Sequence, residues 1–206
     1  MLSHNLAAKF ASAAVLAALV VLPACSINVK DKNKEGRSAV DIKTPVGDLH
    51  VDEQPDIRES GLSVYPGARP APKETGEDKK SANVNLSVPG FALKVVAAEF
   101  ASDDPSDKVL AYYNKELQKY GKAIQCRGPW HGGDVAVNAD KGAWQHKDGD
   151  GLSKPVSCRD SGSGDSVELK VGTEGNQHLV AIKSEGKGTR FALVYIRART
   201  GKENTI

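Results

Sequence analysis

Phe191-Ala-Leu-Val-Tyr-Ile196 is the stretch of this chain that decides its fold. Six consecutive residues without a charge, rich in aromatic and β-branched side chains, are typical of a central strand that is buried on both faces of a sheet. Two strand-like runs precede it, at residues 167–171 and 178–183, and turn residues follow each of them at 174–176 and 186–188. The C-terminal segment therefore predicts a three-stranded meander whose last strand lies in the centre of the sheet.

Upstream of the meander, the pattern predicts a hairpin, a helix and a short strand. Residues 84–88 and 91–97 alternate apolar and polar positions around a Pro89-Gly90 turn. After Asp104, a good N-cap, and Pro105 at the first helical position, the helix places one apolar stripe on its surface. The stripe consists of Leu110, Tyr113, Leu117 and Tyr120. Residues 123–126 then read as a strand.

These elements predict an α+β fold in which one main helix packs on an antiparallel sheet, in the order β-β-α-β-(loop)-β-β-β. A flexible tether is expected to precede this domain, because residues 26–82 hold 21 charged side chains and one aromatic, Tyr65. Residues 83–206 hold nine of the eleven aromatics and form the predicted domain. Within the tether at 25–82, a small hairpin is expected at 39–51, and residues 62–68 are expected to dock on the domain through Leu62, Val64 and Tyr65.

The N-terminus predicts export. Residues 10–22 are thirteen uncharged residues that follow Lys9, a run too short to span a bilayer as a helix but typical of a secretory signal. Leu22-Pro23-Ala24-Cys25 resembles the lipobox of bacterial lipoproteins, in which the chain is cut before the cysteine and the thiol is acylated. The resemblance implies a signal peptide at 1–24 and lipidation of Cys25. The alternative is an ordinary secretory signal that is cut near Ala24.

A second resemblance covers most of residues 60–200. Val64-Tyr-Pro-Gly-Ala68, together with Asp103-Asp-Pro-Ser-Asp-Lys-Val-Leu-Ala-Tyr-Tyr-Asn-Lys-Glu-Leu117, is similar to uncharacterised bacterial lipoproteins of the acidobacterial type. It implies a membrane-anchored protein of the cell envelope and carries no activity. Ser26, rather than Asp, follows the cysteine, which by analogy with double-membrane bacteria implies the periplasmic face of the outer membrane.

Cys126 and Cys158 both lie beyond the signal, in a compartment where disulfides persist. A disulfide between them would close a loop of about 33 residues and contribute roughly 3 to 4 kcal/mol by chain entropy. A reactive thiol pair and a pair of metal ligands are the alternatives. Neither cysteine belongs to a CxxC motif, and the histidines at 131 and 146 show no recognised ligand spacing. The disulfide is the preferred interpretation.

The Gly-rich segment 127–165 is the other candidate region. Trp130 and Trp144 lie in it, either as contacts for a ligand or partner or as anchors of the loop to the sheet. A metal or hydrolytic site here would require residues such as His131, His146, Asp148, Asp150 and His178 to converge. The sequence contains no complete catalytic motif, and no cofactor is predicted.

The sequence therefore predicts a non-catalytic, lipid-anchored envelope protein that binds another envelope component, namely a protein, the cell wall or a polysaccharide. A net charge of +2 gives no general electrostatic reason to bind nucleic acid. The alternative hypothesis is a small-ligand, metal-binding or hydrolytic periplasmic module with its site in the 127–165 loop.

Overall fold

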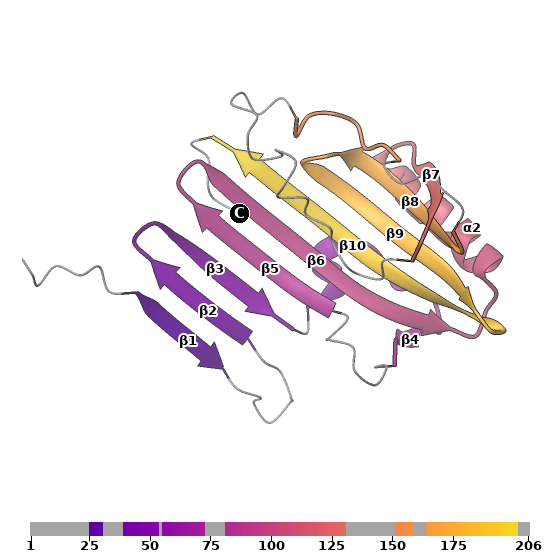
Figure 1. Cartoon of the computed structure of the whole chain (residues 1–206). Helices are drawn as coiled ribbons and strands as arrows, with labels where there is room; N and C mark the ends of the chain where they lie inside the picture. The colour runs from indigo at the N-terminus through magenta and orange to yellow at the C-terminus, as the bar shows by residue number, and fades with distance from the viewer. Residues whose placement is uncertain are drawn as a thin grey trace, which may run out of the picture.

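The computed structural model describes residues 25–30, 39–53, 55–72, 81–130, 151–158 and 164–201. Over these residues the chain forms one antiparallel sheet of ten strands, ordered β1-β2-β3-β5-β6-β10-β9-β8-β7, with β4 paired to β6 outside this path (Figure 1). The strands are β1 (Ser26–Lys30), β2 (Ala39–Thr44), β3 (Gly47–Asp52), β4 (Arg69–Pro70), β5 (Ser81–Val88), β6 (Phe91–Ser102), β7 (Ile124–Gly128), β8 (Ser166–Thr173), β9 (Asn176–Glu185) and β10 (Gly188–Thr200). The other described elements are helix α2 (Ser106–Glu116) and the 3-10 turns η1 (Ile57–Ser60) and η2 (Leu117–Tyr120).

The expectation of an α+β fold with one main helix packed on a sheet, in the order β-β-α-β-(loop)-β-β-β, is wrong. Strands make up most of the described chain, whereas α2 has 11 residues and η2 adds 4. The flexible tether in that expectation is corrected too, because β1, β2 and β3 extend the same sheet. In these strands polar or charged residues alternate with apolar ones. The apolar side chains of each strand therefore lie on one side, next to those of the neighbouring strands.

The pairing of β6 with β10 forms the middle of the sheet. The two strands stay in register from Phe91 opposite Thr200 to Ser102 opposite Thr189. The predicted position of β10 is confirmed, since Phe191, Ala192 and Leu193 are 0% exposed. The meander β8-β9-β10 and the β5-β6 hairpin, with its turn at 89–90, are also present.

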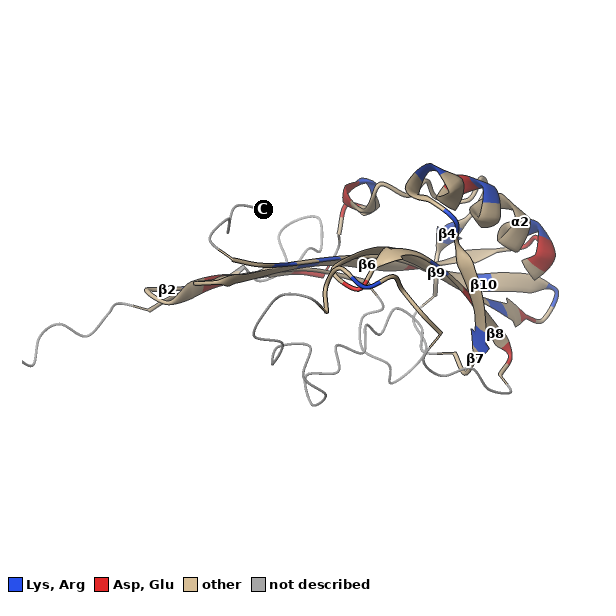
Figure 2. Ribbon diagram, turned by 90° about the horizontal axis from the view of Figure 1, so that it is seen from above, with Lys and Arg blue, Asp and Glu red and all other residues tan. Residues whose placement is uncertain are grey.

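Helix α2 covers one side of the sheet, and only over the part formed by β8, β9 and β10 (Figure 2). Val109, Tyr113 and Leu117 are 0% exposed and pack against side chains of these strands. The strand residues in this core include Phe100, Leu169, Val171, Val180, Ile182, Phe191 and Leu193. The buried face of the helix is therefore the apolar stripe expected around Tyr113 and Leu117, with Val109 deeper in it than Leu110.

Residues 62–68 dock on this core, as the sequence predicts. Leu62 is 3% exposed, and the backbone N–H of Tyr65 donates to the hydroxyl of Tyr113 at 3.0 Å. That hydroxyl in turn donates to the carbonyl of Ser63 at 3.2 Å, and burial raises the pKa of Tyr113. The chain then turns at Pro66-Gly67, where Gly67 has φ +77° and the N–H of Ala68 returns to the carbonyl of Tyr65.

Side chains change faces along the sheet. Near α2, the odd-numbered residues of β10, such as Phe191 and Leu193, point to the helix-covered face. Toward the N-terminal strands, the even-numbered Ile196 and Ala198 of β10 fall in cross-strand rows of apolar side chains on the opposite face. Side chains of a β-strand alternate between the two faces of the sheet. The apolar side chains therefore lie on the helix-covered face near α2 and on the opposite face near the N-terminal strands. Arg197 then lies on the same face as Leu193.

The opposite face is polar where it lies behind the helix-covered core. Arg190 and Glu99 form an ion pair there, with Nε and Oε2 at 3.0 Å and side chains only 4% and 3% exposed. Arg190 also donates to the carbonyl of Pro72, at 3.4 Å. A charge pair buried this deeply is held by several hydrogen bonds, since desolvation would otherwise exceed the attraction between the charges.

His178 joins the docked segment to the sheet. Its ring stacks on Tyr120 with centroids 3.6 Å apart and lies against Tyr195 at 4.9 Å. Burial lowers the pKa of His178 to about 4, with a smaller contribution from nearby Lys119, against an opposing hydrogen bond to the backbone of Ser60. The imidazole is therefore neutral at pH 7.

Replacement of His178 should change how stability depends on pH. The unfolded chain takes up a proton at the ordinary histidine pKa of about 6.5, whereas the folded chain resists protonation down to about 4. The free energy of unfolding should therefore fall as the pH drops through this window, by about 1.4 kcal/mol per pH unit from this group. In urea titrations between pH 7 and pH 4, His178→Phe should lose this component of the slope. Equal pH slopes for the two proteins would contradict the assignment.

Candidate functional site

Cys25, the residue for which the sequence predicts lipidation, lies at the edge of the sheet. Cys25 is exposed and has a free thiol in the structure, and it directly precedes β1, the strand at one end of the sheet. Ile27 and Val29 on this strand are 66% and 60% exposed. Cys25 has the same parity as these two residues, so an extended chain places all three side chains on one face.

That face is apolar across four neighbouring strands and β6. Cross-strand pairing places Ile27 beside Ile42, Leu49 beside Leu86, and Val84 beside Val95. We call this surface the apolar face. It consists of Ile27, Val29, Val40, Ile42, Leu49, Val51, Val84, Leu86, Leu93 and Val95.

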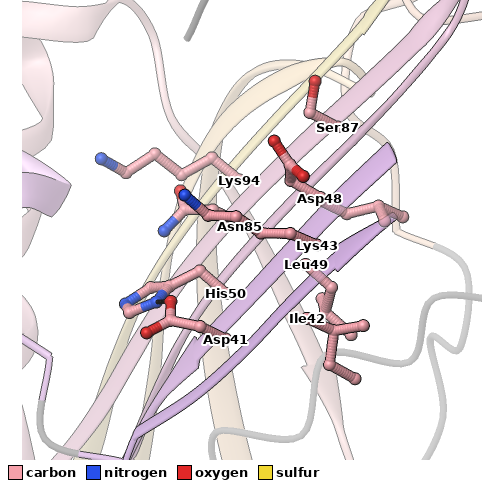
Figure 3. A pocket seen from close by; sticks show the side chains of 10 residues that line it. Asp41, Ile42, Lys43, Asp48, Leu49, His50, Asn85, Ser87 and Lys94 are labelled. Atoms are coloured by element: carbon pink, nitrogen blue, oxygen red, sulfur yellow. Dashed lines mark hydrogen bonds and ion pairs between the residues drawn. The ribbon is translucent and has the colours of Figure 1, made fainter. Parts of the chain in front are cut away.

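The other face of the same strands holds an open cleft of about 440 Å³ (Figure 3). Its lining includes Ile42, Leu49 and Leu86 together with seven polar residues, after which we call it the polar cleft: Asp41, Lys43, Asp48, His50, Asn85, Ser87 and Lys94. They come from β2, β3, β5 and β6, and the view shows Asp41, His50, Asn85 and Lys94 on one side of the strands with Ile42 and Leu49 on the other.

The pairing register of β2, β3, β5 and β6 brings the side chains of the cleft together. Asp41 lies opposite His50, His50 opposite Asn85, and Asn85 opposite Lys94, so these four side chains form one row across four strands. The Nδ1 atom of His50 lies 2.5 Å from Oδ1 of Asp41. At Lys94 the row meets η1, since Nζ of Lys94 contacts Oε2 of Glu59 at 2.7 Å. Arg197 of β10 lies opposite Lys94 in the next strand.

Glu59 belongs to η1 and closes one side of the row. The amide of Asn83 donates to the same Glu59 oxygen at 3.2 Å, and the amide of Asn85 donates to Asn83 at 3.0 Å. Through Glu59, η1 is thus hydrogen-bonded to the polar row. The cleft presents carboxylate, ammonium, imidazole and amide groups together, which suits the recognition of a polar partner carrying both charges. Hydrogen bonding and charge pairing are what this arrangement can supply.

The described parts of the 127–165 region, at 127–130, 151–158 and 164–165, lie at the end of the sheet farthest from β1. The disulfide between Cys126 and Cys158 is confirmed, with Cα atoms 5.5 Å apart, and it ties residues 151–158 to β7. Trp130 is half-buried just after β7. Trp144, His131, His146, Asp148 and Asp150 lie outside the described residues, as does the core of that loop.

No group of three or more His, Cys, Asp or Glu side chains arranged to hold a metal ion occurs in the part of the chain that the structure describes. His178, the one described member of the metal hypothesis, is stacked against tyrosines in the core. Within the same described ranges, no helix is long and apolar enough to span a membrane.

Sequence reasoning missed the polar cleft. The signal was present in the alternation at 39–52, where Asp41 and His50 sit between apolar neighbours. Alternation assigns Asp41 and His50 to the polar sides of their hairpin, but the partner strand β5 is about 30 residues away and its register cannot be read locally. Asn85 and Lys94 could therefore not be placed beside them.

Comparison with known proteins gives no relative for this chain: no family model, curated protein or solved structure matches it. The site has to be interpreted from its own geometry.

Removal of the disulfide should destabilise the sheet end at β7. Because the bond restricts the unfolded chain, Cys126→Ser/Cys158→Ser should lose about 3 to 4 kcal/mol of unfolding free energy in urea titrations of the unacylated mature chain. Cys25→Ser alone, which removes a thiol outside the strands, serves as the control and should unfold like the parent. A loss below about 1 kcal/mol for the double variant would contradict a structural role of the bond.

Proposed function

We propose that this chain is a non-catalytic, lipid-anchored protein of the cell envelope, attached through Cys25 to the periplasmic face of the outer membrane. The lipobox-like Leu22-Pro23-Ala24-Cys25 supports the anchor. The exposure of Cys25 at the residue before the first strand supports it further, because acylation there requires no unfolding of the sheet. Acyl chains on the cysteine hold a protein stably when more than one is attached.

The molecular role proposed for the sheet is to bind another envelope component in the polar cleft. The observation that carries this is the row Asp41–His50–Asn85–Lys94, which gathers groups of both charges in one open cleft. Protein surfaces of this kind select partners through complementary charges and hydrogen bonds. The partner is an envelope protein, the wall or a polysaccharide, and nucleic acid is not expected.

Replacement of the anchor residue tests the first half of the proposal. Cys25→Ser should leave the protein exported but move it from the membrane fraction to the soluble periplasmic fraction, because no thiol remains at the acylated position. Immunoblots of fractionated cells measure the distribution, and Ser26→Ala is a matched control that keeps the thiol. Retention of Cys25→Ser in the membrane fraction would refute lipid anchoring.

Charge reversal in the cleft tests the second half. Lys43 is exposed on β2, and Lys43→Glu should weaken binding of the soluble mature chain to isolated envelope fragments by roughly tenfold or more, as a central contact typically does. Co-sedimentation measures this, with fragments used before and after protease treatment to separate protein from polymer partners.

The control for this experiment carries the same charge change elsewhere. Lys187 lies in the exposed turn between β9 and β10, at the other end of the molecule, and Lys187→Glu should bind like the parent. Equal binding of both variants, or no binding by the parent, would overturn a binding role for the cleft.

A further inference from the structure

The apolar face is a surface of the described sheet that the core under α2 does not explain. Its outermost members, Ile27 and Val29, are more than half exposed, and most of its inner members are half-buried. Helix α2 and η1 both lie on the opposite side: Tyr113 of α2 packs against Phe191, and Glu59 of η1 contacts Lys94. Neither element can therefore cover the apolar face.

The chemistry of this face is uniform. All ten members are aliphatic. The charged residues of β2 and β3 (Asp41, Lys43, Asp48 and Asp52) occupy the alternate positions of their strands, and β5 contains none. The charges of these strands are placed on the polar side, as with Asp41 opposite His50. At about 4.8 Å per strand pair, the face extends about 19 Å from β1 to β6. A broad, uncharged aliphatic surface whose outermost side chains are exposed marks a contact with an apolar partner.

The position of the anchor identifies the partner. Cys25 shares the parity of Ile27 and Val29, so acyl chains on its sulfur emerge on the same side as these side chains. Resting on the lipid anchor of the proposed function, we propose that the apolar face lies on the lipid bilayer. The sheet then lies flat on the membrane surface, with its aliphatic side chains at the boundary between headgroups and acyl chains. The polar cleft and α2 face the aqueous phase.

In this orientation, the lipid anchor and the polar cleft lie on opposite sides of the sheet. The acyl chains supply the attachment, and the apolar face fixes which side of the sheet meets lipid. The cleft on the other side is thereby presented to the periplasm, where an envelope partner can reach it.

Two adjacent residues of β2 provide the test. Ile42 is on the apolar face and Lys43 is on the opposite side. Ile42→Cys and Lys43→Cys are each labelled with an environment-sensitive fluorophore in the full acylated protein, where Cys25 is blocked and Cys126–Cys158 is oxidised. The labelled proteins are reconstituted in phosphatidylethanolamine and phosphatidylglycerol vesicles that contain a lipid-borne quencher. Leu49→Cys and Asp48→Cys repeat the comparison on β3, in case one substitution disturbs folding.

The probe at Ile42 should emit at shorter wavelength and be quenched severalfold more than the probe at Lys43. In the soluble Cys25→Ser protein without lipid, both probes should report water. Equal, water-like emission at both sites in vesicles would overturn the proposal. A shielded Ile42 probe in the soluble protein would overturn it as well: shielding lost on dilution would indicate a second copy, and shielding independent of concentration would indicate a segment of the chain itself.

Failure of the anchor is recognised separately. If the full protein does not float with the vesicles, the proposed lipid anchoring fails before any probe is read. If it floats but the Ile42 and Lys43 probes agree, anchoring stands and only the orientation is wrong.

Discussion

The antiparallel pairing of β6 with β10 is the interaction on which the rest of the structure depends. It joins two halves of different construction: β9, β8 and β7 on one side, and β5, β3, β2 and β1 on the other. The paired stretch of twelve residues from Phe91 to Ser102 is long enough to form part of both halves. Near Phe100 the pair supports the core under α2, whereas near Leu93 it supports a sheet whose polar side carries a cleft.

The exchange of apolar faces explains why these two strands have nearly continuous apolar sequences. In β10, Phe191 and Leu193 point toward the helix, whereas Ile196 points the other way. The residues between them must satisfy both arrangements, and Val194 is only 3% exposed. β6 makes the same transition at Val95 and Val96, which are 7% and 0% exposed. Alternation is therefore lost at the centre of the sheet and restored at each end.

Local signals in the sequence predicted the parts of the fold that are formed locally. The Pro66-Gly67 turn, the β5-β6 hairpin and the helix around Tyr113 each depend on residues within a few positions of one another. The helix begins one residue later than expected, with Pro105 as its N-cap. Asp104 instead accepts hydrogen bonds from the side chains of Lys108 and Tyr65. These bonds, the one from Lys108 having the larger effect, hold the pKa of Asp104 below its ordinary value.

Average composition misassigned the N-terminal strands. A high fraction of charged residues predicts a solvated chain only if the charges are not confined to one side of a strand. In Val40-Asp41-Ile42-Lys43 they are confined, and β5 supplies the partner that an isolated hairpin lacks. The candidate site was out of reach for the same reason, since the row from Asp41 to Lys94 exists only through non-local register. The disulfide was predictable, because the predicted export and the cysteine count restrict the pairing.

The edge of the sheet connects these features to the proposed lipid anchor. A terminal strand with exposed aliphatic side chains, such as Ile27 and Val29, is a template for unwanted pairing with other chains in water. Proteins ordinarily protect such an edge with charges, a bulge or a covering segment. In the proposed orientation, acylation of Cys25 would protect it differently, because it would hold β1 at the bilayer surface, where aliphatic side chains are accommodated and encounters with other edges are restricted. Under this proposal, the spacing of one residue between Cys25 and Ile27 would be a functional constraint, since a longer spacer would let the edge return to water.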